Sequence, residues 1–200
     1  DQPLALACLP YPSKARLVAA GTPHDQIHAV ADAQLDLIFM GLGEQLARAR
    51  AEGRLTGCIG HANIGGSVAS TGQPQIGQEL EVSEAHLLRL GGCFVVFNHI
   101  HKHQRVGHAT YPGSLCRLDA GETEPKGYVV VECGYPSGVG PGGVFPGWQH
   151  TETFIDVPVV PLYHVEGRLT RDGYDWNVRK GPDGPIDTPP TSTTPCEVCA

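Results

Sequence analysis

The most constraining feature of the sequence is a set of apolar residues that recur at intervals of three and four. The set consists of Ile27, Val30, Ala31, Leu35, Ile38, Leu42 and Leu46. This spacing is typical of an amphipathic helix that lays one apolar stripe on a core. Thr22-Pro23 offers a hydroxyl cap and a proline for the first helical position, and Gly53 marks the expected end.

Short apolar runs on both sides of this helix predict buried β-strands at 4–9, which stops at Pro10, and at 55–59. Further strands are predicted at 93–97, 128–133, 153–160 and 162–169, and a short helix capped by Ser83 is predicted at 83–90. Because strands outnumber helices without alternating regularly with them, the pattern predicts a mixed α/β (α+β) fold.

Size, hydropathy and charge exclude several classes of protein. The 200 residues are enough for one domain with a sizeable core, and we find no secretory signal. No apolar run approaches the roughly 20 residues that cross a bilayer. The formal charge is −7, and Lys and Arg form no run longer than a pair. A basic stripe for nucleic acid is therefore missing, so any contact with DNA must be local, metal-assisted or shared with a partner.

Five of the seven cysteines occur singly in apolar surroundings: Cys8, Cys58, Cys93, Cys116 and Cys133. We predict that they are small buried thiols in a reducing cytosol, which places the protein in the cytoplasm. Cys196 and Cys199 form a CxxC pair after a Pro/Thr-rich stretch. Two ligands are too few for zinc, so an uninvolved tail is favoured over half of a zinc clasp or a redox pair.

Histidines follow two of the predicted strands at the points where the chain leaves the sheet. Gly60-His61 ends one strand, and Asn98-His99-Ile100-His101 ends another. Loops at strand ends can direct side chains into a shared cleft, and imidazole suits transition metals. The remaining seven histidines have no such context and are interpreted as ordinary surface or core residues, with His103 only a weak candidate for a further ligand.

Several motifs accompany these histidines in a fixed order. They are Leu9-Pro10-Tyr11-Pro12-Ser13, Gly60-His61, Asn98-His99-Ile100-His101, Tyr111-Pro112-Gly113-Ser114 and Glu124-Pro125-Lys126-Gly127. This order resembles the latter half of the calcineurin-like metallophosphoesterase superfamily, and more narrowly the SbcD-type DNA-repair nucleases. The resemblance covers residues 4–170.

The resemblance implies a function and a set of site residues. His61 and His99 would ligate one divalent metal and His101 the other, most plausibly manganese, making these three the catalytic residues. Two such metals polarise a phosphodiester and activate a water for in-line attack. The expected activity is that of an exo- and endonuclease in double-strand-break repair and recombination. The expected partners are DNA, a second copy in a homodimer and an SbcC-type ATPase subunit.

Two departures from the family pattern bear on this expectation. Asn98 stands where the family has Gly, and Asn is, after Gly, the residue that best tolerates the left-handed turn expected there. The front-half motifs that supply a bridging aspartate, an Asn ligand and a further His are absent. The chain, which starts at Asp1, could be a fragment, one piece of a split enzyme or a degenerate relative. A non-catalytic binding module and a phosphodiesterase for small nucleotides remain alternatives.

For the architecture, the resemblance implies the latter portion of a four-layer sandwich of two mixed β-sheets flanked by helices. Residues 1–150 would form the second half of the metallophosphoesterase domain. Residues 151–180 would be its closing strands or the start of an accessory domain. Residues 181–200, rich in Pro and Thr, are predicted to be a disordered tail.

Overall fold

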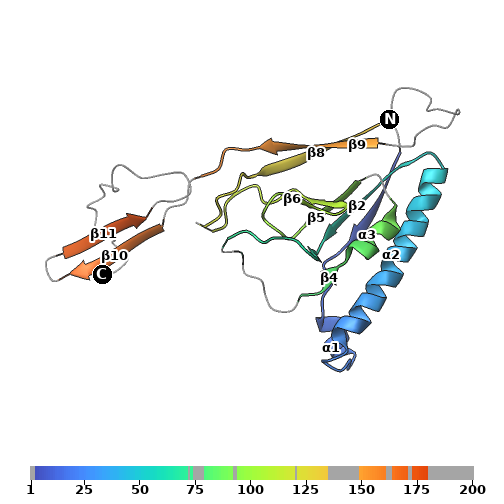
Figure 1. The fold of residues 1–200 in the computed structure, drawn as a ribbon, viewed down its shortest axis with the longest axis horizontal. Helices are drawn as coiled ribbons and strands as arrows, with labels where there is room; N and C mark the ends of the chain where they lie inside the picture. The colour runs from blue at the N-terminus through green and yellow to red at the C-terminus, as the bar shows by residue number, and fades with distance from the viewer. Residues whose placement is uncertain are drawn as a thin grey trace.

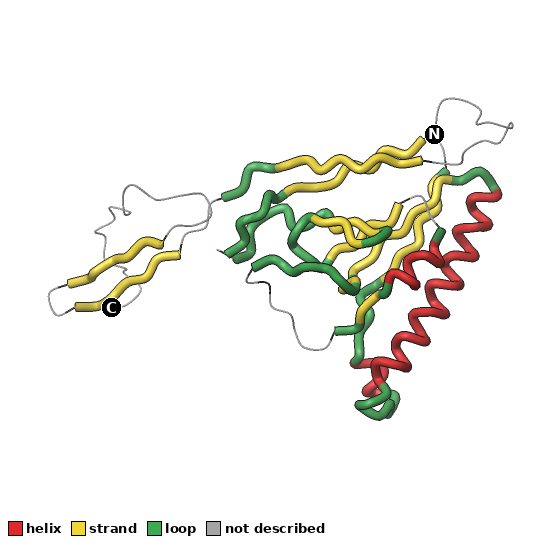
Figure 2. Tube along the Cα trace, in the orientation of Figure 1, coloured by secondary structure: helices red, strands yellow, loops and turns green. Residues whose placement is uncertain are grey.

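The structure is a computed structural model, shown as a ribbon in Figure 1 and as a tube coloured by secondary structure in Figure 2. It describes the following residues: 3–71, 73, 79–91, 94–119, 121–134, 149–160, 164–170 and 173–179, the last two ranges by their backbone. The chain is a mixed α/β protein in which strands outnumber helices, as predicted.

The central element is a five-stranded sheet in the order β1-β2-β5-β7-β6. Its strands are β1 (Leu4–Leu9), β2 (Leu55–His61), β5 (Phe94–Asn98), β7 (Ala109–Tyr111) and β6 (Gln104–Val106). Strands β1, β2, β5 and β7 are parallel, and only β6 pairs antiparallel. The carboxyl ends of the parallel strands therefore meet at one edge, where the predicted histidines follow β2 and β5.

Two helices pack against one face of this sheet: α2 (Ile27–Ala51) and α3 (Glu84–Leu90). A shorter helix, α1 (Ala15–Ala19), leads from β1 toward α2 (Figure 1). The main core lies between α2, α3 and the sheet, with Phe39 and Phe97 fully buried at its centre.

The prediction for α2 was correct in type and in its end but wrong in two details. The helix begins at Ile27, not at Thr22-Pro23, because the chain first makes a turn in which the Gln26 N–H donates to the Pro23 carbonyl. Its buried positions include Leu35, Phe39 and Leu46, whereas the predicted Ile38 is 46% exposed. Phe39 takes the core position because the buried stripe steps mainly by four residues from Ile27.

Ser83 caps the N-terminus of α3 as predicted, and it does so together with the side chain of His86. The Ser83 hydroxyl accepts from the His86 N–H, while the Ser83 N–H donates to His86 Nδ1. This is a capping box with histidine in the place usually held by Glu or Gln.

The remaining strands form three small sheets outside the central one. These are β3 (Asn63–Ile64) with β4 (Glu81–Val82), β8 (Gly127–Gly134) with β9 (Gln149–Asp156), and β10 (His164–Thr170) with β11 (Gly173–Arg179). Strand β8 was predicted to be buried, but Tyr128 and Val130 are exposed because its side chains alternate between two faces. Residues 151–180 contain most of β9 and all of β10 and β11, and residues 181–200 lie outside the described residues.

The cysteines differ in burial more than predicted. Cys58 is buried, and this burial, with a smaller contribution from Cys8, raises its pKa to about 12. The prediction was wrong for Cys8 and Cys116, which are exposed, and Cys133 is half-buried. Cys8 lies on the face of edge strand β1 that α2 does not cover. Cys93, Cys196 and Cys199 lie outside the described residues.

Within the part of the chain that the structure describes, no helix combines the length and the apolarity needed to traverse a bilayer.

The contact between α2 and α3 provides a matched test of the packing. A Cβ atom added to Gly43 would overlap the Arg89 carbonyl of α3, whereas one added to Gly41 meets no atom within 4 Å. We expect Gly43→Ala to lower the free energy of unfolding by about 1–3 kcal/mol through overpacking. Gly41→Ala should raise it by about 0.5–1 kcal/mol through helix propensity. Urea unfolding measures both changes, and equal effects of the two variants would contradict the packing described here.

Candidate functional site

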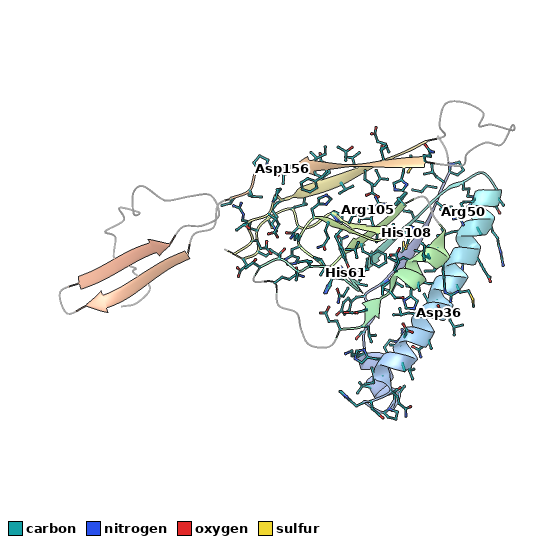
Figure 3. The ribbon with its side chains drawn as sticks, in the orientation of Figure 1. Asp36, Arg50, His61, Arg105, His108 and Asp156 are labelled. Atoms are coloured by element: carbon teal, nitrogen blue, oxygen red, sulfur yellow. The ribbon has the colours of Figure 1, made fainter. Side chains whose placement is uncertain are left out.

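His61 and His99 lie side by side at the carboxyl ends of neighbouring parallel strands. His61 is the last residue of β2 and pairs with Asn98, the last residue of β5. His61 Nε2 and His99 Nδ1 are 3.3 Å apart, and the ring centroids are separated by 5.2 Å. Figure 3 places His61 at this end of the sheet. The ends of the two strands therefore bring His61 and His99 together.

Two residues that the sequence did not single out individually complete this cluster. The Tyr11 ring centroid lies 5.7 Å from that of His61 and 5.5 Å from that of His99. Glu79 Oε2 is 2.8 Å from His99 Nε2, and the Glu79 carboxylate also accepts a hydrogen bond from the Tyr11 hydroxyl. Tyr11 belongs to a motif that signalled a strand exit, while Glu79 ends a polar loop that carried no functional signal.

The electrostatics of this cluster favour a neutral imidazole and a neutral phenol. Burial lowers the pKa of His61, and the neighbouring His99 lowers it further, against the opposing charge of Glu79. Burial also raises the pKa of Tyr11, and the charge and hydrogen bond of Glu79 add to this effect. A neutral His61 keeps one ring nitrogen unprotonated, which is the form that binds a metal.

The backbone turns sharply at His99 itself. His99 has φ of 120°, in the region that favours glycine, whereas Asn98 still belongs to β5. The expectation of a left-handed turn at Asn98 was therefore wrong by one residue. The Gln73 side-chain amide holds this turn, because it donates to the His99 carbonyl at 2.8 Å and accepts from the His101 N–H at 3.1 Å. Such strain typically costs about 1–3 kcal/mol and tends to occur at functional sites.

The His101 ring has a carboxylate partner of its own. Its Nδ1 lies 2.9 Å from Glu122, whose side chain is fully buried. Burial opposes ionisation of Glu122, but hydrogen bonds from Lys126, His101 and the Leu118 N–H hold its pKa below the ordinary value. Glu122 is therefore a carboxylate, and His101 must donate its Nδ1 proton to it.

Lys126 is the cation that permits a buried carboxylate here. Its side chain is 0% exposed, and Nζ lies 2.7 Å from Glu122 and 3.1 Å from Glu124. The same ammonium donates to Ser114 Oγ at 3.0 Å and approaches the His101 carbonyl at 3.4 Å. One buried lysine thus connects the Glu-Pro-Lys-Gly motif to the backbone of His101.

The Tyr-Pro-Gly-Ser motif supports both histidine segments. The buried Tyr111 hydroxyl donates to the Ala62 carbonyl at 2.7 Å and accepts from the Ile64 N–H at 2.8 Å, which fixes the chain just after His61. Gly113 has φ of 85°, and a Cβ atom there would lie 2.8 Å from the His101 carbonyl oxygen. The Ser114 N–H donates to that same carbonyl.

His103 has a structural role in the described residues. Its Nδ1 bonds the Tyr111 carbonyl at 2.9 Å, and its ring stacks on Phe154 with centroids 4.2 Å apart. The background interpretation also suits His86, which caps α3 and stacks on Phe39.

The three candidate ligands fit a metal centre in part. His61 and His99 present nitrogens to a common point, and His101 has an orienting carboxylate, as metal-bound histidines usually do. Across the described ranges, however, no three or more His, Cys, Asp or Glu side chains form a group that could hold an ion. A stable site needs at least about four ligands, so the pair is an incomplete set.

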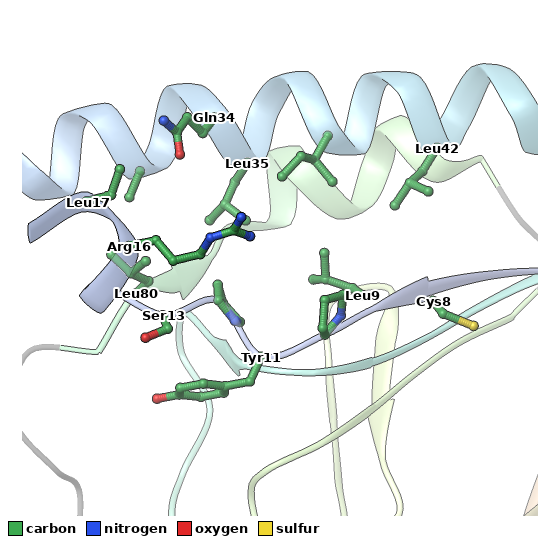
Figure 4. A pocket seen from close by; sticks show the side chains of 14 residues that line it. Cys8, Leu9, Tyr11, Ser13, Arg16, Leu17, Gln34, Leu35, Leu42 and Leu80 are labelled. Atoms are coloured by element: carbon green, nitrogen blue, oxygen red, sulfur yellow. The ribbon is translucent and has the colours of Figure 1, made fainter. Parts of the chain in front are cut away.

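A pocket of about 300 Å³ lies between β1 and α2, away from the three histidines (Figure 4). Its wall is mainly apolar, with Leu35 and Leu42 of α2 opposite Leu9 of β1, and Arg16 lies beneath α2. Tyr11 borders the pocket but points away from α2, toward the histidine pair. The pocket is therefore a neighbour of the candidate site and not part of it.

No model of a known protein family matches the chain, and no curated protein matches it either. The family resemblance therefore rests on the ordered motifs of the sequence alone.

A substitution at Tyr111 tests whether its hydroxyl holds the chain that follows His61 in place. We expect Tyr111→Phe to lower the free energy of unfolding by about 1–3 kcal/mol, because it leaves a buried N–H and a buried carbonyl without partners. Tyr128→Phe removes a hydroxyl from an exposed ring and should change it by less than about 0.5 kcal/mol. Chemical denaturation compares the two, and a neutral Tyr111→Phe would show that this hydroxyl does not hold the chain.

The buried ion pair offers a second test. Lys126→Met keeps the bulk of the side chain but leaves the buried Glu122 carboxylate without its cation, so we expect a loss of about 3–5 kcal/mol in unfolding free energy. The matched control is Arg48→Met, which breaks an exposed pair with Glu44 and should cost less than about 1 kcal/mol. Thermal and urea unfolding provide the measurement. A loss for Lys126→Met no larger than that of the control would contradict the role given to this lysine.

Proposed function

We propose that the chain supplies the histidine ligands of a metal-dependent phosphodiesterase centre that cleaves DNA. The observation that carries the proposal is the 3.3 Å approach of His61 Nε2 to His99 Nδ1, on a strained turn braced by Gln73. Two imidazoles held nitrogen to nitrogen at the carboxyl ends of parallel strands are better suited to sharing a cation than to packing.

In this proposal His61 and His99 hold one divalent metal ion, and His101 holds a second, with manganese as the preferred metal. Such ions neutralise charge that develops on a phosphodiester and lower the pKa of a bound water. The protein's own contribution is positional. Glu122 directs His101 through its Nδ1 proton, and burial keeps His61 neutral and ready to bind.

The arrangement of the sheet supports the finer fold prediction of a four-layer metallophosphoesterase sandwich. Helices α2 and α3 cover one face, and on the opposite face Leu4, Leu6 and Ile59 are exposed. An apolar face of this kind fits a second sheet packed against the first. We also propose a homodimer and an SbcC-type ATPase partner, since the acidic chain would need help to hold DNA.

The alternative is a non-catalytic module on the same scaffold, which the incomplete ligand set among the described residues favours. The two hypotheses differ in one respect that can be measured. A catalytic centre requires both metal and histidines, whereas a module is indifferent to either.

The test is hydrolysis of linear duplex DNA and of small nucleotide phosphodiesters, with and without added manganese. We expect manganese-dependent cleavage of DNA that falls by at least about 100-fold in His99→Ala and His101→Ala, because each loses a ligand. His24→Ala removes an exposed histidine outside the site and should leave the rate unchanged. Faster hydrolysis of small nucleotides than of DNA would replace DNA as the proposed substrate. An absence of hydrolysis with every metal tried would favour the non-catalytic module.

A further inference from the structure

We propose that the free edge of strand β1 is a docking site for an extended peptide, which adds to the central sheet as a further parallel strand and directs its C-terminal carboxylate toward Arg16. The inference does not depend on the proposed metal centre. It gives a partner to a strand edge, and to a groove beside α2, that the proposed function leaves unused.

Strand β1 has one paired edge and one open edge. It stands first in the order of the sheet and pairs with β2, and no described strand pairs with its other edge. The Leu55 N–H of β2 donates to the Pro3 carbonyl at 3.0 Å. Because successive residues of a strand point their backbone groups to alternate sides, the groups of Ala7 also face β2. The N–H and carbonyl groups of Leu6 and Cys8 therefore face the open edge.

This edge lacks the features that usually prevent a strand from pairing with another chain. Natural edges are commonly interrupted by a charged residue, a proline or a bulge. The segment Leu4–Leu9 contains neither a charged residue nor a proline, and its ladder with β2 has no bulge. Leu4 and Leu6 are 50% and 42% exposed on the face opposite α2 and α3, although parallel sheets are normally covered on both faces. The edge is therefore open to a further strand.

Two adjoining hollows form a groove between this edge and α2. One, of about 400 Å³, is lined by residues 5–8, and the pocket of about 300 Å³ in Figure 4 is lined by residues 8–13. Consecutive side chains of a strand alternate between faces, so a hollow that touches residues 5–8 in succession lies along the strand edge itself. Cys8 and Leu42 line both hollows. The groove thus follows β1 along its length, with α2 as its second wall.

Arg16 places a positive charge at the end of the groove that lies beyond the carboxyl end of β1. Figure 4 shows its side chain beneath α2, within the mainly apolar pocket. Its guanidinium has no hydrogen bond or ion pair with another described residue. The two other arginines of the groove, Arg48 and Arg54, each pair with a glutamate. Arg16 is therefore the cation that is available to an anionic partner among the described residues of the groove.

The position of Arg16 selects the direction of the added strand. A peptide that runs parallel to β1 brings its C-terminal carboxylate to Arg16, whereas an antiparallel peptide brings its N-terminus there. A carboxylate beside a guanidinium gains a charge-assisted hydrogen bond. In binding of this kind, main-chain hydrogen bonds supply affinity, and pockets for alternate side chains supply specificity. The partner is thus a peptide end with apolar residues at every second position.

The first experiment uses the N-acetylated hexapeptide Thr-Val-Thr-Leu-Thr-Leu, which can direct its apolar residues toward α2. Titration calorimetry on the full chain compares this peptide, with its free carboxylate, and its C-terminal amide. We expect the free acid to bind about 3–10-fold more tightly, because only the acid carries the charge that Arg16 recognises. Arg16→Gln should remove this difference. Arg105→Gln, an equal loss of charge on the opposite edge strand β6, should retain it.

The second experiment locates the peptide by amide hydrogen exchange of the full chain, followed by NMR. Without peptide, the Leu6 and Cys8 N–H groups should exchange faster than the Ala7 N–H, which faces β2. With the acid peptide at about ten times its dissociation constant, exchange at Leu6 and Cys8 should slow about 10-fold. Exchange at Ala7 should not change.

Several results would overturn the proposal. Protection of Leu6 and Cys8 without peptide would mean that the edge is already covered, by a second copy if the protection rises with protein concentration and by the chain itself if it does not. Peptide binding that leaves these two amides unprotected would place the peptide elsewhere. Equal affinities of acid and amide would contradict the role of Arg16, and failure of both peptides to bind would exclude the docking site.

Discussion

The buried ammonium of Lys126 is the interaction on which the histidine segments depend. A carboxylate as enclosed as Glu122 is stable only beside a cation, and Lys126 lies 2.7 Å from it. Glu122 also accepts a hydrogen bond from His101 Nδ1, so the buried ion pair fixes the orientation of the His101 ring. Glu124, the Ser114 hydroxyl and the His101 carbonyl are further acceptors around the ammonium, so the chain on both sides of β7 is held to one point.

The parallel sheet fixes the positions of His61 and His99, as the ion pair does for His101. Adjacent parallel strands end at the same edge, so the crossover through α3 that joins β2 to β5 brings the two rings together. The hydroxyl of Tyr111 then fixes the chain that leaves β2, and Gln73 fixes the turn that leaves β5. The positive φ of His99 is maintained by these neighbours and not by local preference, since histidine gains nothing from that conformation.

Periodicity predicted the elements that bury apolar residues, because burial follows directly from the spacing of side chains. It succeeded for α2, β2 and β5, and it brought His61 to His99. It failed where a contact joins residues that are distant in sequence and have no pattern of their own. Glu79 and Gln73 lie in a polar loop, and nothing local indicates that Lys126 is buried or that the turn falls on His99. The exposure of Cys8 was missed because an edge strand looks like a central one in sequence.

The charge distribution connects the site to its proposed substrate. The chain carries a net −7 and concentrates Glu79, Glu122 and Glu124 around its histidines. A field of this sign attracts divalent cations and repels a phosphate backbone. In the proposed function, metal ions would reverse the sign of the local charge at the place where the phosphodiester would approach. An acidic protein without a basic stripe can act on DNA in this way, provided that a partner or a second copy holds the rest of the duplex.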